Sequence, residues 1–267
     1  MARRAGGWWW VAVLAMLALS GVASGRTSDS GQFVKRTVTV DGRQSRYQVF
    51  VPRDAQAQRG SLPVVLFLHG SGERGSDGRK QTQAGVGPYL RAHARDFPAL
   101  VVLPQVPEDE EWAGINNRIA LAALDATIAE FGADPARQYL TGMSMGGYGS
   151  WNIALEHPDR FAALVPVCGA VLAPRAVRAT LFVEAVADEA DPYAAMAARL
   201  KATPIWTFHG ALDDVVLPAD DRKLKAAFDA AGARDMRYTE YPQGNHNAWD
   251  ATYADAAMWE WLFAQRR

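Results

Sequence analysis

The chain has 267 residues, 49% of them hydrophobic, so it can bury one large core or two small ones. Its 28 basic and 29 acidic side chains nearly cancel, which gives no electrostatic reason to expect nucleic acid or an acidic membrane surface as a partner. The single cysteine, Cys168, excludes an intrachain disulfide and is expected to be a small core residue. A neutral or small substrate fits this charge balance best.

The N-terminus has the layout of a signal peptide. Arg3 and Arg4 precede an uncharged run over residues 5–25, whose apolar centre covers residues 8–19. This centre is shorter than the roughly 20 residues needed to span a bilayer, although an uncleaved anchor is the alternative. We therefore expect residues 1–25 to be a signal peptide, with export to the periplasm or the cell exterior and no stable membrane insertion once the signal is cleaved.

From residue 33 onward the pattern indicates a single domain that begins with a hairpin. Residues 34–40 and 47–51 alternate apolar and polar side chains around Asp41-Gly42, which predicts two antiparallel strands joined by a tight turn. Short, mostly apolar runs follow, as is typical of strands buried on both faces: residues 64–68, 99–103, 138–140, 163–167, 205–208 and 237–241.

Segments with helical spacing lie between these runs, and the apolar positions that define them are Ile119, Leu121, Leu124, Ile128 and Phe131, then Leu224, Ala227 and Phe228. Strands that alternate with helices predict a mostly parallel sheet with helices on both faces, preceded by the antiparallel hairpin, in one domain over residues 33–267. The alanine-rich residues 171–200 fit this pattern least well, and we expect them to form either helical surface or a lid over the site.

One motif carries a candidate nucleophile. Gly142-Met143-Ser144-Met145-Gly146-Gly147 follows the predicted strand 138–140 and precedes a helix-forming run, so Ser144 lies at a strand-to-helix turn. Such a turn is sharp and brings neighbouring backbone very close, which explains why positions 142 and 146 are glycine. The helix N-terminus behind Ser144 favours developing negative charge there.

A serine hydroxyl needs a base to remove its proton, and the chain offers five histidines. His93 and His157 lie in helical contexts, while His69 and His209 each end an apolar run before a glycine and are expected to shape loops. His246 lies in a loop between the last predicted strand and the final helix. Elimination and position therefore select His246 as the general base.

The base in turn needs a carboxylate to orient it, and Asp213 and Asp214 both follow a strand end. We favour Asp213, because Asp214 runs straight into an apolar pair and is expected to brace the loop. The chain order Ser144, Asp213, His246 is that of α/β-hydrolases.

The backbone amide of Met145 is expected to form one half of an oxyanion hole. The glycine-rich loop 69–72 supplies the other half, with Ser71 as the leading candidate and Gly70 as the second. Aromatic side chains at Trp112, Tyr148 and Trp249 could line an apolar or sugar-binding cleft, although core positions are their common alternative.

Three other classes of protein are alternatives. Residues 70–75 match Gly-x-Gly-x-x-Gly after a strand, but a polar loop follows where a nucleotide-binding fold needs a helix. The histidines show no metal-ligand spacing, so no metal is expected. A catalytically silent binding protein on the hydrolase fold is the better rival, although it would have little reason to keep all three residue types in order.

With these residues in view, residues 33–267 resemble the α/β-hydrolase superfamily. They are specifically similar to secreted predicted peptidases and to dienelactone-hydrolase-like and phospholipase/carboxylesterase-like serine hydrolases, which are related to feruloyl and acetylxylan esterases. The motifs that carry the resemblance are residues 69–75, 142–148 with Trp151, 157–161, 204–216 and 246–250. One departure is Leu217, which separates Val216 from Pro218 where relatives have the proline directly after the valine.

The resemblance implies ester or amide cleavage through an acyl-enzyme and carries the nucleophile, acid and base onto Ser144, Asp213 and His246. We therefore expect an exported serine hydrolase that acts on small-molecule or polymer-linked carboxylic esters, with peptides as the second substrate class and without a cofactor.

Overall fold

The computed structural model describes residues 29–174 and 178–267. The predicted signal peptide, residues 1–25, lies outside the described residues. Within the described ranges, no helix combines the length and apolar character needed to cross a membrane.

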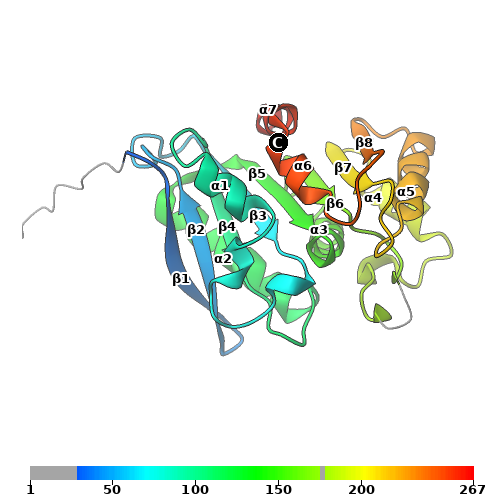
Figure 1. Cartoon of the computed structure of the whole chain (residues 1–267), viewed down its shortest axis with the longest axis horizontal. Coiled ribbons are helices and arrows are strands. Elements are labelled where there is room, and N and C mark those ends of the chain that lie inside the picture. The colour runs from blue at the N-terminus through cyan, green and yellow to red at the C-terminus, as the bar shows by residue number, and fades with distance from the viewer. Residues whose placement is uncertain (1–28, 175–177) are drawn as a thin grey trace, which may run out of the picture.

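A single eight-stranded sheet organises the described chain (Figure 1). Its spatial order is β1-β2-β4-β3-β5-β6-β7-β8, and β2 runs antiparallel to both of its neighbours while β3 to β8 are mutually parallel. The strands are β1 Gln32–Val40, β2 Arg43–Val51, β3 Leu62–Leu68, β4 Leu100–Pro104, β5 Ala133–Met143, β6 Ala163–Val167, β7 Ile205–Gly210 and β8 Met236–Tyr241. The mostly parallel sheet predicted from the sequence is confirmed.

The predicted N-terminal hairpin is also confirmed. Val40 pairs with Arg43, so only Asp41 and Gly42 form the connection between the two strands. Both residues have positive φ, 49° and 79° respectively, which is the backbone of a type I′ turn and matches the twist of the strands it joins.

Helices cover both faces of the sheet. Neighbouring residues of a buried strand point to opposite faces, so alternate residues pack with different sets of helices. In β3, Val64 and Leu66 pack with α2, α3, α4 and α5, whereas Val65 and Phe67 pack with α1, α6 and α7. The helices are α1 Val86–Ala92, α2 Ile115–Phe131, α3 Met145–Glu156, α4 Pro192–Leu200, α5 Ala219–Ala230, α6 Trp249–Ala254 and α7 Ala256–Ala264, with short 3-10 turns at η1 Ser71–Glu73, η2 Lys80–Thr82 and η4 Glu184–Val186.

The described part of residues 171–200 belongs to the packed body of the domain. Val183 donates its amide to the Val171 carbonyl, and Met196 and Leu200 of α4 are buried in the core on the α3 and α5 side. This packing agrees with the expected helical surface, and a lid over the site stays a prediction.

Candidate active site

Ser144 lies at the sharp turn between β5 and α3, with φ of 53° and ψ of −119°. A methyl group at Gly146 would lie 1.9 Å from the Leu68 carbonyl oxygen, and one at Gly142 would lie 2.2 Å from the Gly146 oxygen. The Ser144 amide donates to the Val167 carbonyl at 2.9 Å, which ties the turn to the neighbouring strand. The close approach of backbone inferred from the glycines is therefore present, and it holds Ser144 in a strained conformation at the carboxyl edge of the sheet.

His246 reaches the serine from the loop between β8 and α6. Its Nε2 lies 2.9 Å from Ser144 Oγ, and its Nδ1 lies 2.7 Å from Asp213 Oδ2. The imidazole is half-buried and stands edge-on to the Trp249 ring, with 5.4 Å between ring centroids. Of the five histidines, the structure thus brings His246 to Ser144, as position and elimination predicted.

Asp213 is buried, whereas Asp214 is exposed. Asp213 Oδ1 accepts the backbone amides of Val215 and Val216, at 2.9 and 3.0 Å, and Oδ2 faces the histidine. Burial alone raises the pKa of the Asp213 carboxyl, but hydrogen bonds from two histidines and a backbone amide outweigh burial and hold that pKa well below its usual range. Asp213 is therefore an ionised acceptor for the histidine.

Backbone contacts hold the loop between β7 and α5 (residues 211–218, the acid loop) against the loop between β8 and α6 (residues 242–248, the histidine loop). The Ala211 amide donates to the Tyr241 carbonyl at 2.9 Å, and the Leu212 amide donates to the Gly244 carbonyl at 2.8 Å. A methyl group at Gly210 would lie 2.1 Å from the Asn245 oxygen, so the two loops touch through their main chains. This contact explains how residues 33 positions apart come within hydrogen-bond distance.

Of the predicted oxyanion-hole residues, Met145 and Gly70 lie next to Ser144. Met145 begins α3, so its amide has no acceptor within the helix. Gly70 lies beside the serine, since a methyl group there would be 3.6 Å from Ser144 Cβ and 3.2 Å from a Glu73 carboxylate oxygen. The Ser71 side chain and carbonyl are tied by two arginines, through Arg178 Nη1 to Oγ at 3.0 Å and Arg74 Nε to the carbonyl at 3.1 Å.

Glu73 was not recognised from the sequence as part of the site. Its carboxylate accepts a hydrogen bond from the Gly70 amide. Burial raises the pKa of the Glu73 carboxyl, and hydrogen bonds from the Gly70 amide and its own amide oppose that rise only in part. The Gly70 amide therefore already has an acceptor, and the Ser71 amide stays the leading candidate for the second half of the oxyanion hole.

The predicted aromatic cleft is only partly supported. Trp112 is 2% exposed, and its indole N–H donates to the His69 carbonyl, so it supports the loop from the interior and the prediction that it contacts substrate does not agree with its burial. Tyr148 is also buried, with its hydroxyl donating to the Leu172 carbonyl, although one edge lines a hollow beside the acid loop. Trp249 is half-exposed against His246, and its contact with substrate stays a prediction.

His69 shapes the oxyanion loop, as expected for a histidine at a strand end. Its Nε2 accepts the Val106 amide at 3.0 Å, and its Nδ1 lies 2.7 Å from the Gly70 carbonyl, to which it donates. Burial lowers the pKa of His69 to about 4, so the ring is neutral at physiological pH and serves as a fixed donor and acceptor.

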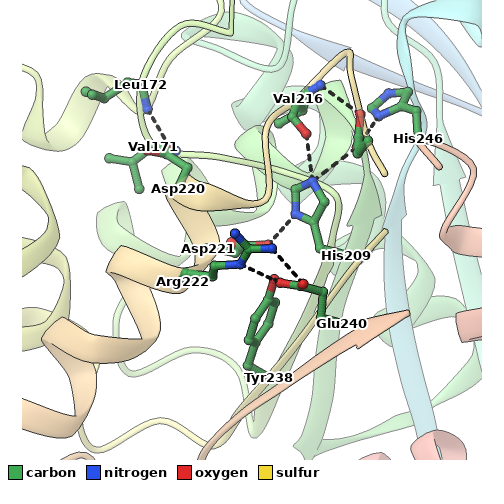
Figure 2. Close-up of polar contacts among 11 residues, drawn as sticks. Val171, Leu172, His209, Val216, Asp220, Asp221, Arg222, Tyr238, Glu240 and His246 are labelled. Carbon is green, nitrogen blue, oxygen red and sulfur yellow. Dashed lines mark hydrogen bonds and ion pairs between the residues drawn. The ribbon is translucent and has the colours of Figure 1, made fainter. Parts of the chain in front are cut away.

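A second buried histidine touches Asp213 and was not recognised from the sequence as part of the site. His209, in β7, lies between Asp213 and Asp221 of α5 and also contacts the Val216 carbonyl (Figure 2). The available signal was its position four residues before Asp213, but nothing in the local sequence marks Asp221 as its partner.

Among the described residues, one group of three potential metal ligands lies within 4.8 Å of one another: Cys168, Asp213 and His246. Burial raises the pKa of the Cys168 thiol well above its ordinary value, so the thiolate that a metal requires is disfavoured. Both ring nitrogens of His246 already face partners in the row with Ser144 and Asp213. The donor set therefore fits a hydrogen-bonded row better than a metal centre.

Comparisons with known proteins agree with this fold. A solved thermostable esterase is 32% identical, with a TM-score of 0.71 over 88% of this chain and 63% of that one. A ferulic acid esterase shares the fold at 16% identity, with a TM-score of 0.67 over 88% of this chain and 98% of that one. In Burkholderia cepacia, 2-hydroxy-6-oxo-6-phenylhexa-2,4-dienoate hydrolase is 32% identical over 127 residues, which are 46% of this chain and 40% of that protein.

Sheet order, the Ser144 turn and these similarities define the class of the protein: it is an α/β-hydrolase, among the serine hydrolases. The profile of the prolyl oligopeptidase family matches residues 118–265, more than half of the chain. The chain therefore belongs to the prolyl oligopeptidase family. It spans less than half the length of the Burkholderia relative and about two thirds of the thermostable esterase.

Proposed function

We propose that this protein is an exported serine hydrolase that cleaves carboxylic esters through an acyl-enzyme, with Ser144 as nucleophile, His246 as general base and Asp213 as the orienting acid. One observation carries the proposal. Ser144 Oγ, the two ring nitrogens of His246 and Asp213 Oδ2 form a continuous row, with gaps of 2.9 and 2.7 Å. These are hydrogen-bond distances of the kind that nucleophilic catalysis needs.

The row assigns a direction to each proton. Asp213 is ionised and can only accept, so His246 donates Nδ1–H to it and leaves Nε2 free to accept the Ser144 hydroxyl proton. As Oγ attacks the ester carbonyl carbon, that proton moves to Nε2, and the charge that develops on the imidazole is stabilised by Asp213. The carbonyl oxygen becomes an oxyanion between the Met145 and Ser71 amides.

Collapse of this intermediate breaks the bond to the alkoxy oxygen. The leaving alcohol takes the proton from His246 Nε2, and the acyl group stays on Ser144. Water then gives a proton to Nε2 and attacks the acyl carbon, which releases the carboxylic acid and restores the serine hydroxyl. Apart from the ester and water, the side chains and amides described supply every group that these steps use.

The surface beside Asp213 supports an ester with an apolar group. Among the described residues, the exposed large apolar side chains are Leu172, Leu212, Val215 and Leu217, with 50%, 60%, 40% and 58% exposure. Three of the four lie on the acid loop itself. Leu172 and Leu217 also line the hollow of about 210 Å³ that reaches Tyr148. Apolar surface gathered at a polar site is typical of a binding surface.

We rank esters before peptides as substrates because a solved thermostable esterase is 32% identical to this chain and covers 88% of it. Peptides are the second class, since the family name refers to peptide cleavage. Export rests on the basic and apolar N-terminus alone.

The proposal is tested by hydrolysis of p-nitrophenyl esters of increasing acyl length, with the wild-type chain and the Ser144→Ala variant side by side. The wild type is expected to turn over these esters, with lower KM for longer acyl chains, and the variant is expected to lose about a thousandfold or more of kcat while its circular dichroism is unchanged. Equal turnover by a folded Ser144→Ala variant contradicts the role of Ser144. Absence of turnover and of active-site labelling in the wild type favours a silent binding protein.

A further inference from the structure

His209 is an imidazole without solvent exposure that lies between two carboxylates. Its Nδ1 is 2.7 Å from Asp221 Oδ2, and its Nε2 is 3.1 Å from Asp213 Oδ2 and 2.8 Å from the Val216 carbonyl oxygen (Figure 2). His209 belongs to β7, whereas Asp221 lies in the first turn of α5 and is itself buried. The two elements therefore meet through this ring directly beneath the acid loop.

The contacts fix which ring nitrogen carries a proton. A carbonyl oxygen can only accept, so the contact with Val216 requires a hydrogen on His209 Nε2. The same N–H faces Asp213 Oδ2, which makes a shared hydrogen bond to both oxygens. His209 is thus a donor to Asp213 whatever the state of its other nitrogen.

The second proton is held between His209 and Asp221. Burial alone lowers the pKa of His209, but its hydrogen bonds to Asp213 and Asp221 outweigh burial and raise that pKa to about 10. Whether this proton resides on Nδ1 or on the Asp221 oxygen, the pair keeps it throughout the neutral range and is neutral as a whole. Asp213 therefore faces an unchanging donor.

Other charged groups near His209 have partners of their own. Glu240 of β8 accepts from Arg222 Nε and Nη2, at 2.8 and 2.7 Å, and from the Tyr238 hydroxyl at 2.5 Å (Figure 2). His246 approaches from the opposite side and meets the same Asp213 oxygen. Among the described residues, the titratable groups around the ring include Asp213, Asp221, Glu240 and, across Asp213, His246. Cys168 is a further one, with its Sγ within 4.8 Å of the ligand atoms of Asp213 and His246.

We propose that His209 is a positioning residue for the catalytic acid: its Nε2–H and the two loop amides hold the Asp213 carboxylate with Oδ2 toward His246, and Asp221 fixes the ring from behind. This inference rests on the proposed function. The four donors leave Asp213 one orientation in which every bond is made.

Asp213 Oδ2 accepts hydrogen bonds from both His209 and His246, the general base. His209 withdraws electron density from the oxygen that accepts the His246 Nδ1–H, so it weakens the attraction between Asp213 and a protonated His246. Loss of this donor strengthens that attraction, so protonation of His246 becomes more favourable in a variant that lacks it. The acid limb of the pH dependence of kcat/KM then moves to higher pH, which a purely structural role does not predict.

The test compares two nearly isosteric variants. His209→Gln keeps an N–H donor toward Asp213 and Val216, and His209→Met has the same length without one. The methionine variant is expected to lose about 10-fold to 100-fold of kcat with KM within about twofold, and its acid limb is expected to shift upward by about half a pH unit. The glutamine variant is expected to restore kcat to within about fivefold of wild type, with the wild-type acid limb.

The outcomes separate this inference from the proposed function. Equal kcat and equal acid limbs in the two variants, in a chain whose Ser144→Ala variant is inactive, overturn the role of His209 and leave the proposed function intact. Activity that persists in Ser144→Ala overturns the proposed function instead.

A measurement on the unmutated chain keeps the test independent of folding defects. Nitrogen-15 NMR of labelled histidines is expected to show a His209 ring N–H resonance that persists up to about pH 9 and moves when a phosphonate occupies Ser144. A His209 resonance that titrates near its ordinary value of 6.5 and ignores the phosphonate overturns the inference.

Discussion

The nucleophile turn and the acid loop lie at the same edge of the sheet but are held in different ways. Ser144 is placed by main chain alone, through contacts that leave no room for a side chain at Gly142 or Gly146. Asp213 is placed by a buried side-chain network through His209 and Asp221, in addition to two loop amides. The nucleophile should therefore be most sensitive to an added atom, and the acid to a lost donor or charge.

The largest effect is expected where backbone touches backbone. Gly146→Ala places a methyl group 1.9 Å from the Leu68 oxygen, in a central strand that cannot move aside, so the free energy of unfolding should fall by about 3 kcal/mol or more. Gly72→Ala is the matched control, because a methyl group there meets no atom within 4 Å. Urea denaturation followed by fluorescence measures both. Equal stability of the two variants contradicts the account of the turn.

The acid loop should respond to a change of charge without a change of size. Asp213→Asn removes the acceptor for His246 and is expected to lower kcat by about 10³-fold to 10⁴-fold, whereas Asp214→Asn should change it by less than about threefold. Steady-state hydrolysis of one p-nitrophenyl ester provides both values. Comparable losses in the two variants mean that the wrong carboxylate is assigned to the base.

A region of the site can be predicted from the sequence when the residues that hold it are neighbours in the chain. The nucleophile turn was predictable because its determinants, Gly142 and Gly146, are neighbours of Ser144 in the chain. The His209 and Asp221 pair was not, since it depends on α5 lying against the end of β7, and no local pattern reports that packing. Fold class and the hairpin were predictable from periodicity and turn residues.

Trp112 was expected to line a cleft, but its side chain is buried. Its predicted place in a cleft followed from residue type, but the side chain points inward to the His69 carbonyl. Trp112→Phe removes this hydrogen bond and should lower the free energy of unfolding by about 1 kcal/mol while KM stays within about twofold. Thermal unfolding and ester kinetics measure the two quantities. A large rise in KM at constant stability restores Trp112 as a substrate contact.

The pH dependence of stability reports on the proton held by His209. His209 holds its proton up to about pH 10 in the folded chain, against an ordinary value of 6.5 when unfolded. Its stabilising contribution is therefore complete below about pH 6.5 and is lost as the pH rises toward about 10. The decline in unfolding free energy over this window should be shallower in His209→Gln than in wild type. Parallel curves contradict the retained proton.

The most direct test of the central claim is to label the purified chain with a fluorophosphonate probe and to locate the adduct by mass analysis of the digested protein. We expect one adduct, on Ser144, formed rapidly in the wild type, slowly in Asp213→Asn and not at all in Ser144→Ala, because only a serine activated by His246 attacks the phosphorus. A folded wild-type chain that takes no adduct, or that carries it on another residue, would contradict the assignment of Ser144 as the nucleophile.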